Sequence, residues 1–207
     1  VYKRQPLIVC LSFFALIFLG ACLLDLPIAS ANGERIGFLN AFFTSTSASC
    51  VTGLIVANTA TQWTVFGKVV IIILIQIGGL GTMVFLSLVA MALNKRIGIT
   101  ERRIIKEQTS ADTSKGIIRL VIYIIKFSLT VELIGAILLA TKFIPDFGLE
   151  RGILFSIFHS ISAFCNAGFD IIGNSLTDYV SDFTVNMTIS ILIIFGGLGF
   201  TVFIDIY

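Results

Sequence analysis

The chain has 207 residues, of which 57% are hydrophobic and 13% are charged, and its mean hydropathy is +1.02. These values exclude a water-soluble domain, and the gathering of apolar residues into long runs excludes a disordered chain or a disulfide scaffold. A formal charge of +2 is too small for a nucleic-acid-binding protein. We therefore expect an all-α integral membrane protein that contacts the lipid bilayer and no nucleic acid.

Two long apolar runs and one short run fill the first half of the chain. Residues 7–28 and 69–93 exceed the about 20 residues that a helix needs to cross about 30 Å of hydrocarbon. Residues 36–49 are too few to cross, a length typical of a core helix or of a re-entrant segment that enters the membrane and returns on the same side. This short run ends at the sequence CVTGL, which starts at Cys50.

A basic segment follows the second long run. Residues 94–119 hold seven basic side chains against three acidic ones. Positive charge marks cytoplasmic loops, so we expect a plasma-membrane, multi-pass protein with the 94–119 loop in the cytoplasm. The surface expected on the opposite side, residues 25–66 and 142–184, holds three basic residues against seven acidic ones. Such a field raises the local concentration of cations.

The second half of the chain has the same layout as the first. Long apolar runs at 117–141 and 186–204 enclose a short run at 152–164, which leads into the sequence CNAGF. The third long run contains Lys126 and Glu132, each either a buried charge or a side chain that reaches the interface.

An internal repeat explains this layout. A shift of 115 residues aligns the short runs and their surroundings, namely Gly20, Phe43, Cys50 and Gly53 with Gly135, Phe158, Cys165 and Gly168. A shift of 118 residues aligns GGLGTMVF at Gly78 with GGLGFTVF at Gly196. Each unit crosses the membrane twice, so the units are parallel and equivalent loops meet around one axis. We expect a first helix-pore-helix repeat at 1–94, a cytoplasmic basic loop at 95–116 and a second repeat at 117–207.

The two five-residue sequences after the short runs are the candidate ion site. Non-helical backbone at membrane depth must be buried in protein or line a watery cavity. A glycine at the fourth place of each sequence adopts positive φ without steric cost, which allows the carbonyls to turn toward a cavity. A ring of such carbonyls replaces the hydration shell of a cation, and the negative ends of the short helices favour the same charge. The candidate ion-binding residues are Cys50, Val51, Thr52, Gly53, Leu54, Cys165, Asn166, Ala167, Gly168 and Phe169.

These segments, together with IQIGGLG from Ile75, resemble the Trk/Ktr/HKT superfamily of potassium transporters, and most closely its bacterial Ktr-type membrane subunits. Members contain four such units around one pore, so the resemblance implies that this chain is the N-terminal half, with two of four repeats. The fold implied is potassium-channel-like: parallel tandem repeats of transmembrane helix, re-entrant pore helix plus filter loop, and transmembrane helix. Cys50 and Cys165 depart from the Thr and Asn often found there, which affects side-chain packing more than carbonyl coordination.

The resemblance also implies a function. It implies potassium uptake across the plasma membrane, with K⁺ or Na⁺ as the transported or coupling ion, and no covalent cofactor. Glycine rather than serine at the place of Gly53 goes with potassium preference in plant members. The partners implied are a second full-length chain in a homodimer and a cytoplasmic ring of nucleotide-binding regulatory subunits.

Two alternatives remain at this point: a tetrameric cation channel assembled from shorter chains, and a sodium-conducting member of the same superfamily. The sequence shows no paired acid and base, activated nucleophile or phosphate-binding loop, so we do not expect an enzyme. His159 is interpreted as a packed, hydrogen-bonded side chain in preference to a proton-linked group.

Overall fold

The computed structural model describes residues 5–94 and 113–198. Within these ranges the regular elements are all helical, which confirms the expected all-α class, and the single β-bridge joins Ser30 to Trp63. The α-helices are α1 (Gln5–Leu24), α2 (Phe38–Ser49), α3 (Thr59–Gln62), α4 (Val65–Asn94), α6 (Thr113–Phe147), α7 (Leu149–Phe164) and α8 (Phe183–Gly197). Two short 3-10 turns are η1 (Pro27–Ala29) and η2 (Thr177–Tyr179). Most of the predicted basic loop lies outside the described residues.

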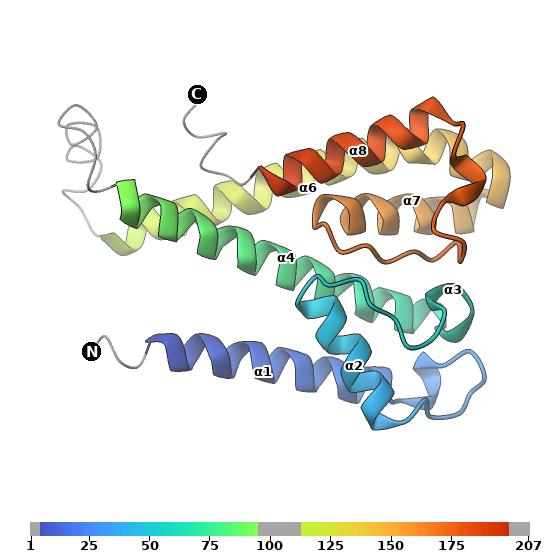
Figure 1. Cartoon of the computed structure of the whole chain (residues 1–207), viewed down its shortest axis with the longest axis horizontal. Coiled ribbons are helices and arrows are strands. Elements are labelled where there is room, and N and C mark those ends of the chain that lie inside the picture. Colours follow the sequence, from blue (N-terminus) through green and yellow to red (C-terminus); the bar gives the residue numbers. More distant parts are fainter. Residues whose placement is uncertain (1–4, 95–112, 199–207) are drawn as a thin grey trace.

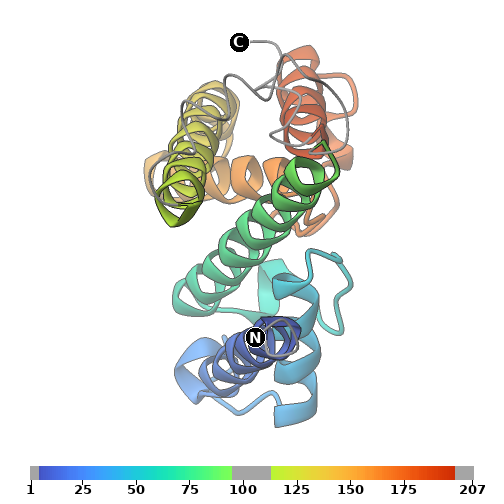
Figure 2. The ribbon, with the colours of Figure 1, turned by 90° about the vertical axis from the view of Figure 1, so that its left-hand side faces the viewer.

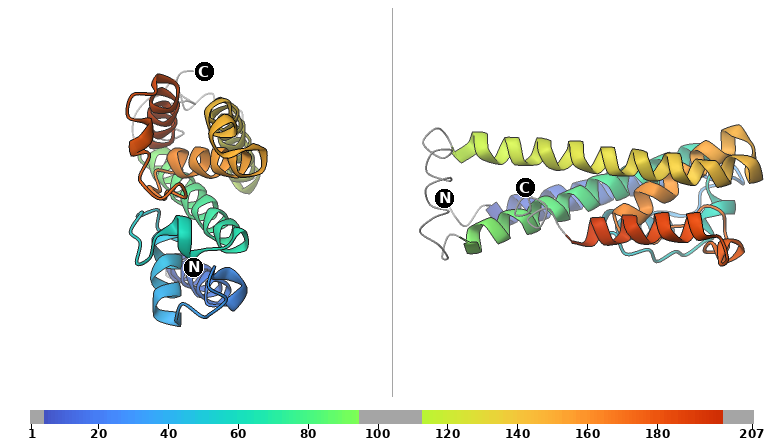
Figure 3. Two further views of the ribbon diagram at one scale, coloured as in Figure 1. Left: turned by 90° about the vertical axis from the view of Figure 1, so that its right-hand side faces the viewer. Right: turned by 90° about the horizontal axis from the view of Figure 1, so that it is seen from above.

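The helices form two groups in space (Figure 1). We call α1, α2 and α4 the first unit, and α6, α7 and α8 the second unit. Figure 2 shows α4 running obliquely from the first group toward the second, and the view from above in Figure 3 shows α4, α6 and α8 extending along the long axis of the molecule. Because α4 packs against both its own unit and the second unit, it joins the two.

Helix ends differ from the predicted runs for identifiable reasons. The first run was expected to reach residue 28, but α1 ends at Leu24 because Pro27 restricts Leu26 to an extended conformation, with φ −67° and ψ 140°. In the second unit α6 continues six residues beyond the predicted end and includes Pro145 in its last turn. Gly148 then separates α6 from α7 with φ +80°.

Membrane-crossing length is reached by one helical segment among the described residues, Val121–Phe147, which has 27 residues. Three further helical stretches in the same part of the chain are apolar but shorter, Cys10–Leu24, Val65–Gly81 and Phe183–Gly197. The expectation of four crossings therefore stays a prediction.

Each short helix is attached to the long helix before it by one serine. In the first unit Ser45 Oγ donates a hydrogen bond to the carbonyl oxygen of Ile17, at 2.7 Å. In the second unit Ser160 Oγ donates to the carbonyl oxygen of Glu132, at 2.6 Å. Both pairs are 28 residues apart, so the same contact forms at equivalent places in the two units.

Glycines permit this close approach of the helices. A methyl group at Gly20 would collide with Ser45 Oγ, and one at Gly135 would lie 2.6 Å from Ser160 Oγ. Each would also lie 2.7 Å from a leucine of the third helix of its unit, Leu74 or Leu192. Small residues at these crossings let the backbones approach and pack tightly.

Candidate functional site

The segment at residues 50–54, called here the first filter segment, turns sharply at the end of α2. Val51 has φ +56° and Gly53 has φ +78°, both in the left-handed region. The backbone N–H of Thr52 donates to the carbonyl oxygen of Ser47 at 2.9 Å, which closes the turn onto the last turn of the helix. The backbone conformation expected for Gly53 is therefore present, and Val51 adds a second left-handed residue that the sequence did not predict.

The second filter segment, residues 165–169, repeats this turn after α7. Asn166 has φ +59° and Gly168 has φ +68°. The backbone N–H of Ala167 donates to the carbonyl oxygen of Ser162 at 2.8 Å. Two different five-residue sequences thus adopt the same backbone path.

The two filter segments lie against each other. A methyl group at Gly53 would lie 2.5 Å from the carbonyl oxygen of Ala167 and 3.3 Å from the Cα of Gly168. Further along, Asn58 Nδ2 donates to the carbonyl oxygen of Gly173 at 3.3 Å. Segments that are 115 residues apart in the sequence therefore meet at one place in the molecule.

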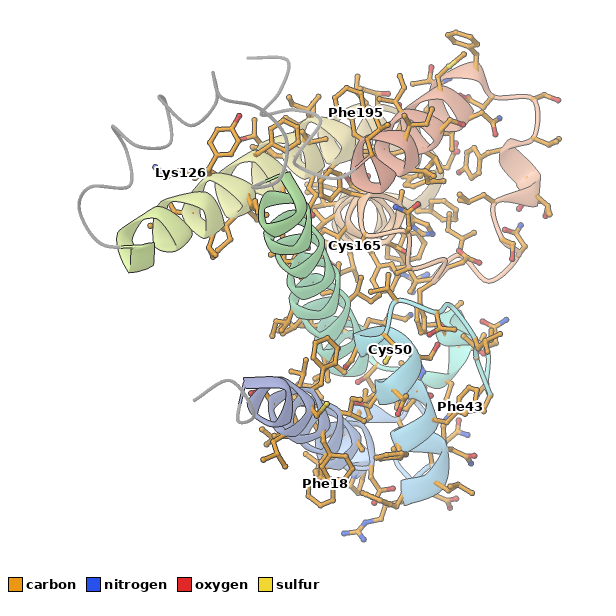
Figure 4. All side chains as sticks on the ribbon, turned by 60° about the vertical axis from the view of Figure 1, so that its left-hand side comes forward. Phe18, Phe43, Cys50, Lys126, Cys165 and Phe195 are labelled. Carbon is orange, nitrogen blue, oxygen red and sulfur yellow. The ribbon has the colours of Figure 1, made fainter. Side chains whose placement is uncertain are left out.

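The glycines of the repeated GGLG sequence support both filter segments from behind. A methyl group at Gly78 would collide with the carbonyl oxygen of Ser49, and one at Gly196 with that of Phe164. The next residue of α4, Gly79, faces the other unit, since a methyl group there would lie 2.6 Å from Cys165 Sγ. Figure 4 shows Cys50 and Cys165 beside α4, with Phe18, Phe43 and Lys126 directed outward.

Side chains fix the end of the second filter segment. Ser162 Oγ donates to the carbonyl oxygen of Phe169 at 2.8 Å. His159, which is 3% exposed, has Nδ1 at 2.8 Å from the carbonyl oxygen of Phe155 and Nε2 at 2.9 Å from Asp170 Oδ1. A carbonyl oxygen only accepts, so Nδ1 carries a hydrogen. His159 is a packed, hydrogen-bonded residue, as interpreted from the sequence.

Asp170 is the centre of this hydrogen-bond network. Besides His159, its carboxylate accepts from the backbone N–H groups of Ile172, Gly173 and Ser175, at 2.7, 2.7 and 2.9 Å. Burial alone would raise the pKa of Asp170, but the hydrogen bonds from His159 and the backbone outweigh it and hold the pKa well below its usual range. Asp170 is therefore a carboxylate that organises the loop after the filter segment.

A cavity of about 250 Å³ lies beside the second filter segment. Asn166, Gly168 and Phe169 line it from the filter side, and Ile189 and Ile193 line it from α8. The polar side chains of His159, Ser162, Asp170 and Ser175 also border this cavity, so it is lined by both apolar and polar groups.

The first filter segment has fewer side-chain supports. Ser47, the counterpart of Ser162, has a buried hydroxyl without a hydrogen-bond partner. Leu54, Ile55 and Val56 are 59%, 51% and 46% exposed. The end of this segment is therefore held by fewer contacts than the end of the second.

The structure brings together Gly53, Ala167 and Gly168 among the ten predicted site residues. It places Cys165, Ala167 and Phe169 in the core, leaves Val51 and Gly53 partly buried, and exposes the other five, which are Cys50, Thr52, Leu54, Asn166 and Gly168. Sequence reasoning missed Asp170 and Ser162 as supports of the second segment. The signal available was an aspartate directly after the glycine-bearing segment, a residue type that often binds nearby backbone N–H groups.

Known proteins share this sequence over nearly all of the chain. Residues 7–207 match the TrkH family, described as cation transport protein. The chain is 47% identical over 194 residues to the potassium/sodium uptake protein NtpJ of Enterococcus hirae, covering 94% of this chain and 43% of that protein. It is 46% identical over 201 residues to the Ktr system potassium uptake protein B of Bacillus subtilis, covering 97% and 45%. A protein of the same name from Vibrio alginolyticus is 39% identical over 203 residues, covering 98% and 44%.

The chain thus spans less than half the length of the curated relatives that it matches. The match nevertheless extends over all six of the predicted apolar runs. It confirms the resemblance found in the sequence and the expectation of a transport protein in place of an enzyme. The chain belongs to the TrkH family of cation transport proteins.

Proposed function

We propose that the whole protein takes up potassium across the plasma membrane through a pore to which both filter segments contribute backbone carbonyls. The observation that carries this proposal is the pair of matched turns, each with a left-handed glycine and each lying against the other. The two repeat copies keep this turn although their other side chains differ, which supports a common task of the backbone itself.

The same proposal includes the membrane arrangement. Each unit is a transmembrane helix, a re-entrant pore helix with its filter segment, and a second transmembrane helix. The repeats are parallel, at 1–94 and 117–207, and the basic loop at 95–116 is cytoplasmic. The matched serine contacts of α2 and α7 support the repeat, because they attach each short helix to its unit in the same way.

The mechanism follows from backbone chemistry. A potassium ion leaves water only if oxygen atoms replace its hydration shell, and carbonyls turned inward by the left-handed residues provide them. The helices α2 and α7 end at Ser49 and Phe164, directly before the two filter segments, so the negative dipole end of each helix adjoins a filter segment and favours a cation. The protein forms no bond with the ion beyond this coordination, so no covalent cofactor is required.

Sodium is the second candidate ion. The relative from Enterococcus hirae is named for potassium and sodium uptake, whereas the two Ktr relatives are named for potassium alone. Gly53 favours potassium by the family resemblance. Competition between the two ions in one uptake assay separates these readings, since a potassium transporter keeps its rubidium uptake in excess sodium.

The assembly is also part of this proposal. We expect the whole chain to form a homodimer and to bind a cytoplasmic ring of nucleotide-binding regulatory subunits. Relatives named as proteins of a Ktr system fit an assembly with further components. A whole protein of about the length of the chain described here would instead favour the alternative of a tetrameric channel with shorter subunits.

The test is rubidium or potassium uptake by the whole protein in cells or liposomes. Gly53→Asp and Gly168→Asp should each reduce uptake at least about tenfold, because a side chain at a left-handed position costs about 1–3 kcal/mol and adds a carboxylate at the segment. The matched control is Gly33→Asp, since Gly33 also has positive φ but has no atom within 4 Å of its added Cβ. Wild-type uptake in both filter variants would refute the proposed pore.

A further inference from the structure

A buried polar pair connects the two units between α4 and α6. Gln76 Nε2 donates a hydrogen bond to Glu132 Oε1 at 3.0 Å. Glu132 is 4% exposed, and its position lies within the apolar segment Val121–Phe147. A carboxyl group in such surroundings is costly if it is charged and unpaired.

The remaining oxygen of each side chain has no partner. Glu132 Oε2 and Gln76 Oε1 are both buried and form no hydrogen bond. Ser128, one turn earlier on α6, also has a buried hydroxyl that bonds to neither of them. As a carboxylate and an amide, the pair would hold two acceptor oxygens with no donor between them, which destabilises the folded protein because each buried acceptor has lost its water without gaining a partner.

No cationic side chain neutralises Glu132 within the part of the chain that the structure describes. Lys142 forms its ion pair with Asp182, and His159 pairs with Asp170. Lys126, the nearest lysine on the same helix, is exposed and lies six residues away, which is not a same-face spacing. The carboxyl group therefore needs another source of positive charge or must be neutral.

We propose that Glu132 binds a proton and that the resulting carboxylic acid forms a closed pair with Gln76. Gln76 Nε2 donates to Glu132 Oε1, and the added hydrogen on Oε2 donates to Gln76 Oε1. One proton removes the buried charge and satisfies both unpartnered oxygens, so a single event accounts for both observations. A bound metal ion would account for the charge but would need several more oxygen ligands directed at one point.

Comparison of the units assigns this pair a role at their junction. The counterpart of Glu132 in the first unit is Ile17, whose carbonyl makes the same contact with a serine. The counterpart of Gln76 in the second unit is Ile194. The sequence departs from the repeat at both positions together, and Gln76 lies one turn before Gly79, which packs on Cys165. The proton-bearing pair is thus a positioning element that holds α4 against α6 beside the second filter segment.

The first experiment measures the proton without measuring transport. Infrared spectra of the whole protein in liposomes should contain a carbonyl band of a protonated carboxylic acid that disappears in Glu132→Gln. In Gln76→Leu the band should shift in frequency, because the acid loses its amide partner. A spectrum in which Glu132→Gln removes only a carboxylate band would overturn the proposal and indicate a bound cation. This result does not depend on potassium uptake, so it stands apart from the proposed function.

The second experiment uses variants that keep or break the closed pair. Glu132→Gln leaves an amide–amide pair with both hydrogen bonds, so uptake and thermal stability should stay within about twofold and a few degrees of wild type. Gln76→Leu should lower both, and the exchange Gln76→Glu with Glu132→Gln should restore them. Thr130→Val is the control on α6, since Thr130 is exposed and bonds only within its helix.

Two outcomes contradict the neutral pair. A folded Glu132→Gln protein with uptake reduced tenfold or more would mean that the negative charge itself is required. An exchanged pair that remains as impaired as Gln76→Leu would mean that the two side chains do not act together. If Glu132→Gln does not accumulate, the double variant Gln76→Glu with Glu132→Gln replaces it in the test. Its infrared spectrum should again contain the band of a protonated carboxylic acid.

Discussion

The two filter segments share a backbone turn but differ in how side chains secure it. The second segment is tied down by Ser162 on Phe169 and by His159 on Asp170. In the first unit Thr44 stands at the place of His159 and bonds only within α2, and Ile55 stands at the place of Asp170. The turn itself therefore needs only a helix end and left-handed residues, whereas the loop that follows it is fixed by a charged network in one unit alone.

This difference separates the contacts that both units share from the contacts that only the second unit has. The repeated elements, the serine contacts and the glycines, specify where each filter segment starts. The contacts that are not repeated, those of His159 and Asp170, hold the end of the second filter segment alone. Variants at equivalent positions should therefore have equal effects on stability where the contact is repeated, and unequal effects where only one unit has the contact.

The largest expected difference is at Asp170 and its counterpart Ile55. Asp170→Ala leaves His159 and three backbone N–H groups without their acceptor, which should destabilise the folded state by about 3 kcal/mol or more. Ile55→Ala removes an exposed side chain and should be nearly neutral. Thermal unfolding of the purified whole protein measures both, and equal effects of the two variants would remove the asymmetry.

Equal and substantial effects are expected for the shared helix crossings. Gly20→Ala and Gly135→Ala each place a methyl group against a serine hydroxyl and a leucine. Overpacking of this kind costs about 1–3 kcal/mol, so both variants should lose similar amounts of stability. A large loss at one position and none at the other would show that the two units are not packed alike. Gly81→Ala, where the added methyl group would make only an ordinary contact with Phe13 at 3.8 Å, tests for a general effect of replacing a helical glycine.

A smaller asymmetry is expected for the two serines below the filter segments. Ser162→Ala removes the hydrogen bond to the carbonyl oxygen of Phe169 and should cost about 1 kcal/mol. Ser47→Ala removes a hydroxyl that has no partner and should cost less or even stabilise the protein. Unfolding midpoints of the two variants, measured side by side, decide this point, and the reverse order would contradict it.

The smallest difference between the two units is expected at the starts of α4 and α8. Thr64 Oγ1 accepts from the N–H of Gly67 at 3.3 Å, and Asp182 Oδ1 accepts from that of Val185 at 3.0 Å. Thr64→Ala removes this cap together with the hydrogen bond that Thr64 Oγ1 donates to the carbonyl oxygen of Ile28 at 2.8 Å, and should cost about 1 kcal/mol. Asp182 also pairs with Lys142 at 2.8 Å, so its cap, unlike that of Thr64, should depend on pH and salt.

The sign of this pH dependence follows from the titration of Asp182. The hydrogen bond from Lys142, with that from the N–H of Val185, lowers the pKa of Asp182 in the folded protein. Its contribution is therefore complete above the unfolded pKa of about 4 and is lost as the pH falls through the lower folded value. The stability difference between wild type and Asp182→Ala should shrink below about pH 4, while Thr64→Ala shows no such change.

Much of the fold was predictable from local sequence, but the supports of the site were not. Apolar runs and the repeat predicted the helices, because burial in lipid selects composition over a long stretch. The end of α1 was misjudged by four residues because hydropathy does not register the restriction that Pro27 imposes. Within the site, only the glycines carried a local signal of backbone conformation.

The hydrogen-bond partner of Glu132 shows why the remainder could not be predicted. Lys126 lies six residues from Glu132 on α6, which is not a same-face spacing, so the sequence of this helix offers Glu132 no charged partner. The actual partner, Gln76, is 56 residues away on a helix of the other unit. Contacts of this kind depend on how the units pack, so they leave no periodic mark in the sequence.

Two adjacent glycines in α4 have a consequence for building chimeric proteins. Gly78 contacts the end of α2 and Gly79 contacts Cys165, the residue that follows α7. One turn of α4 thus packs against both units, so the two units cannot be separated at this turn without losing a contact. A chimera that takes one unit from a relative should fold only if the junction lies outside this turn and if α4 and α7 come from the same protein.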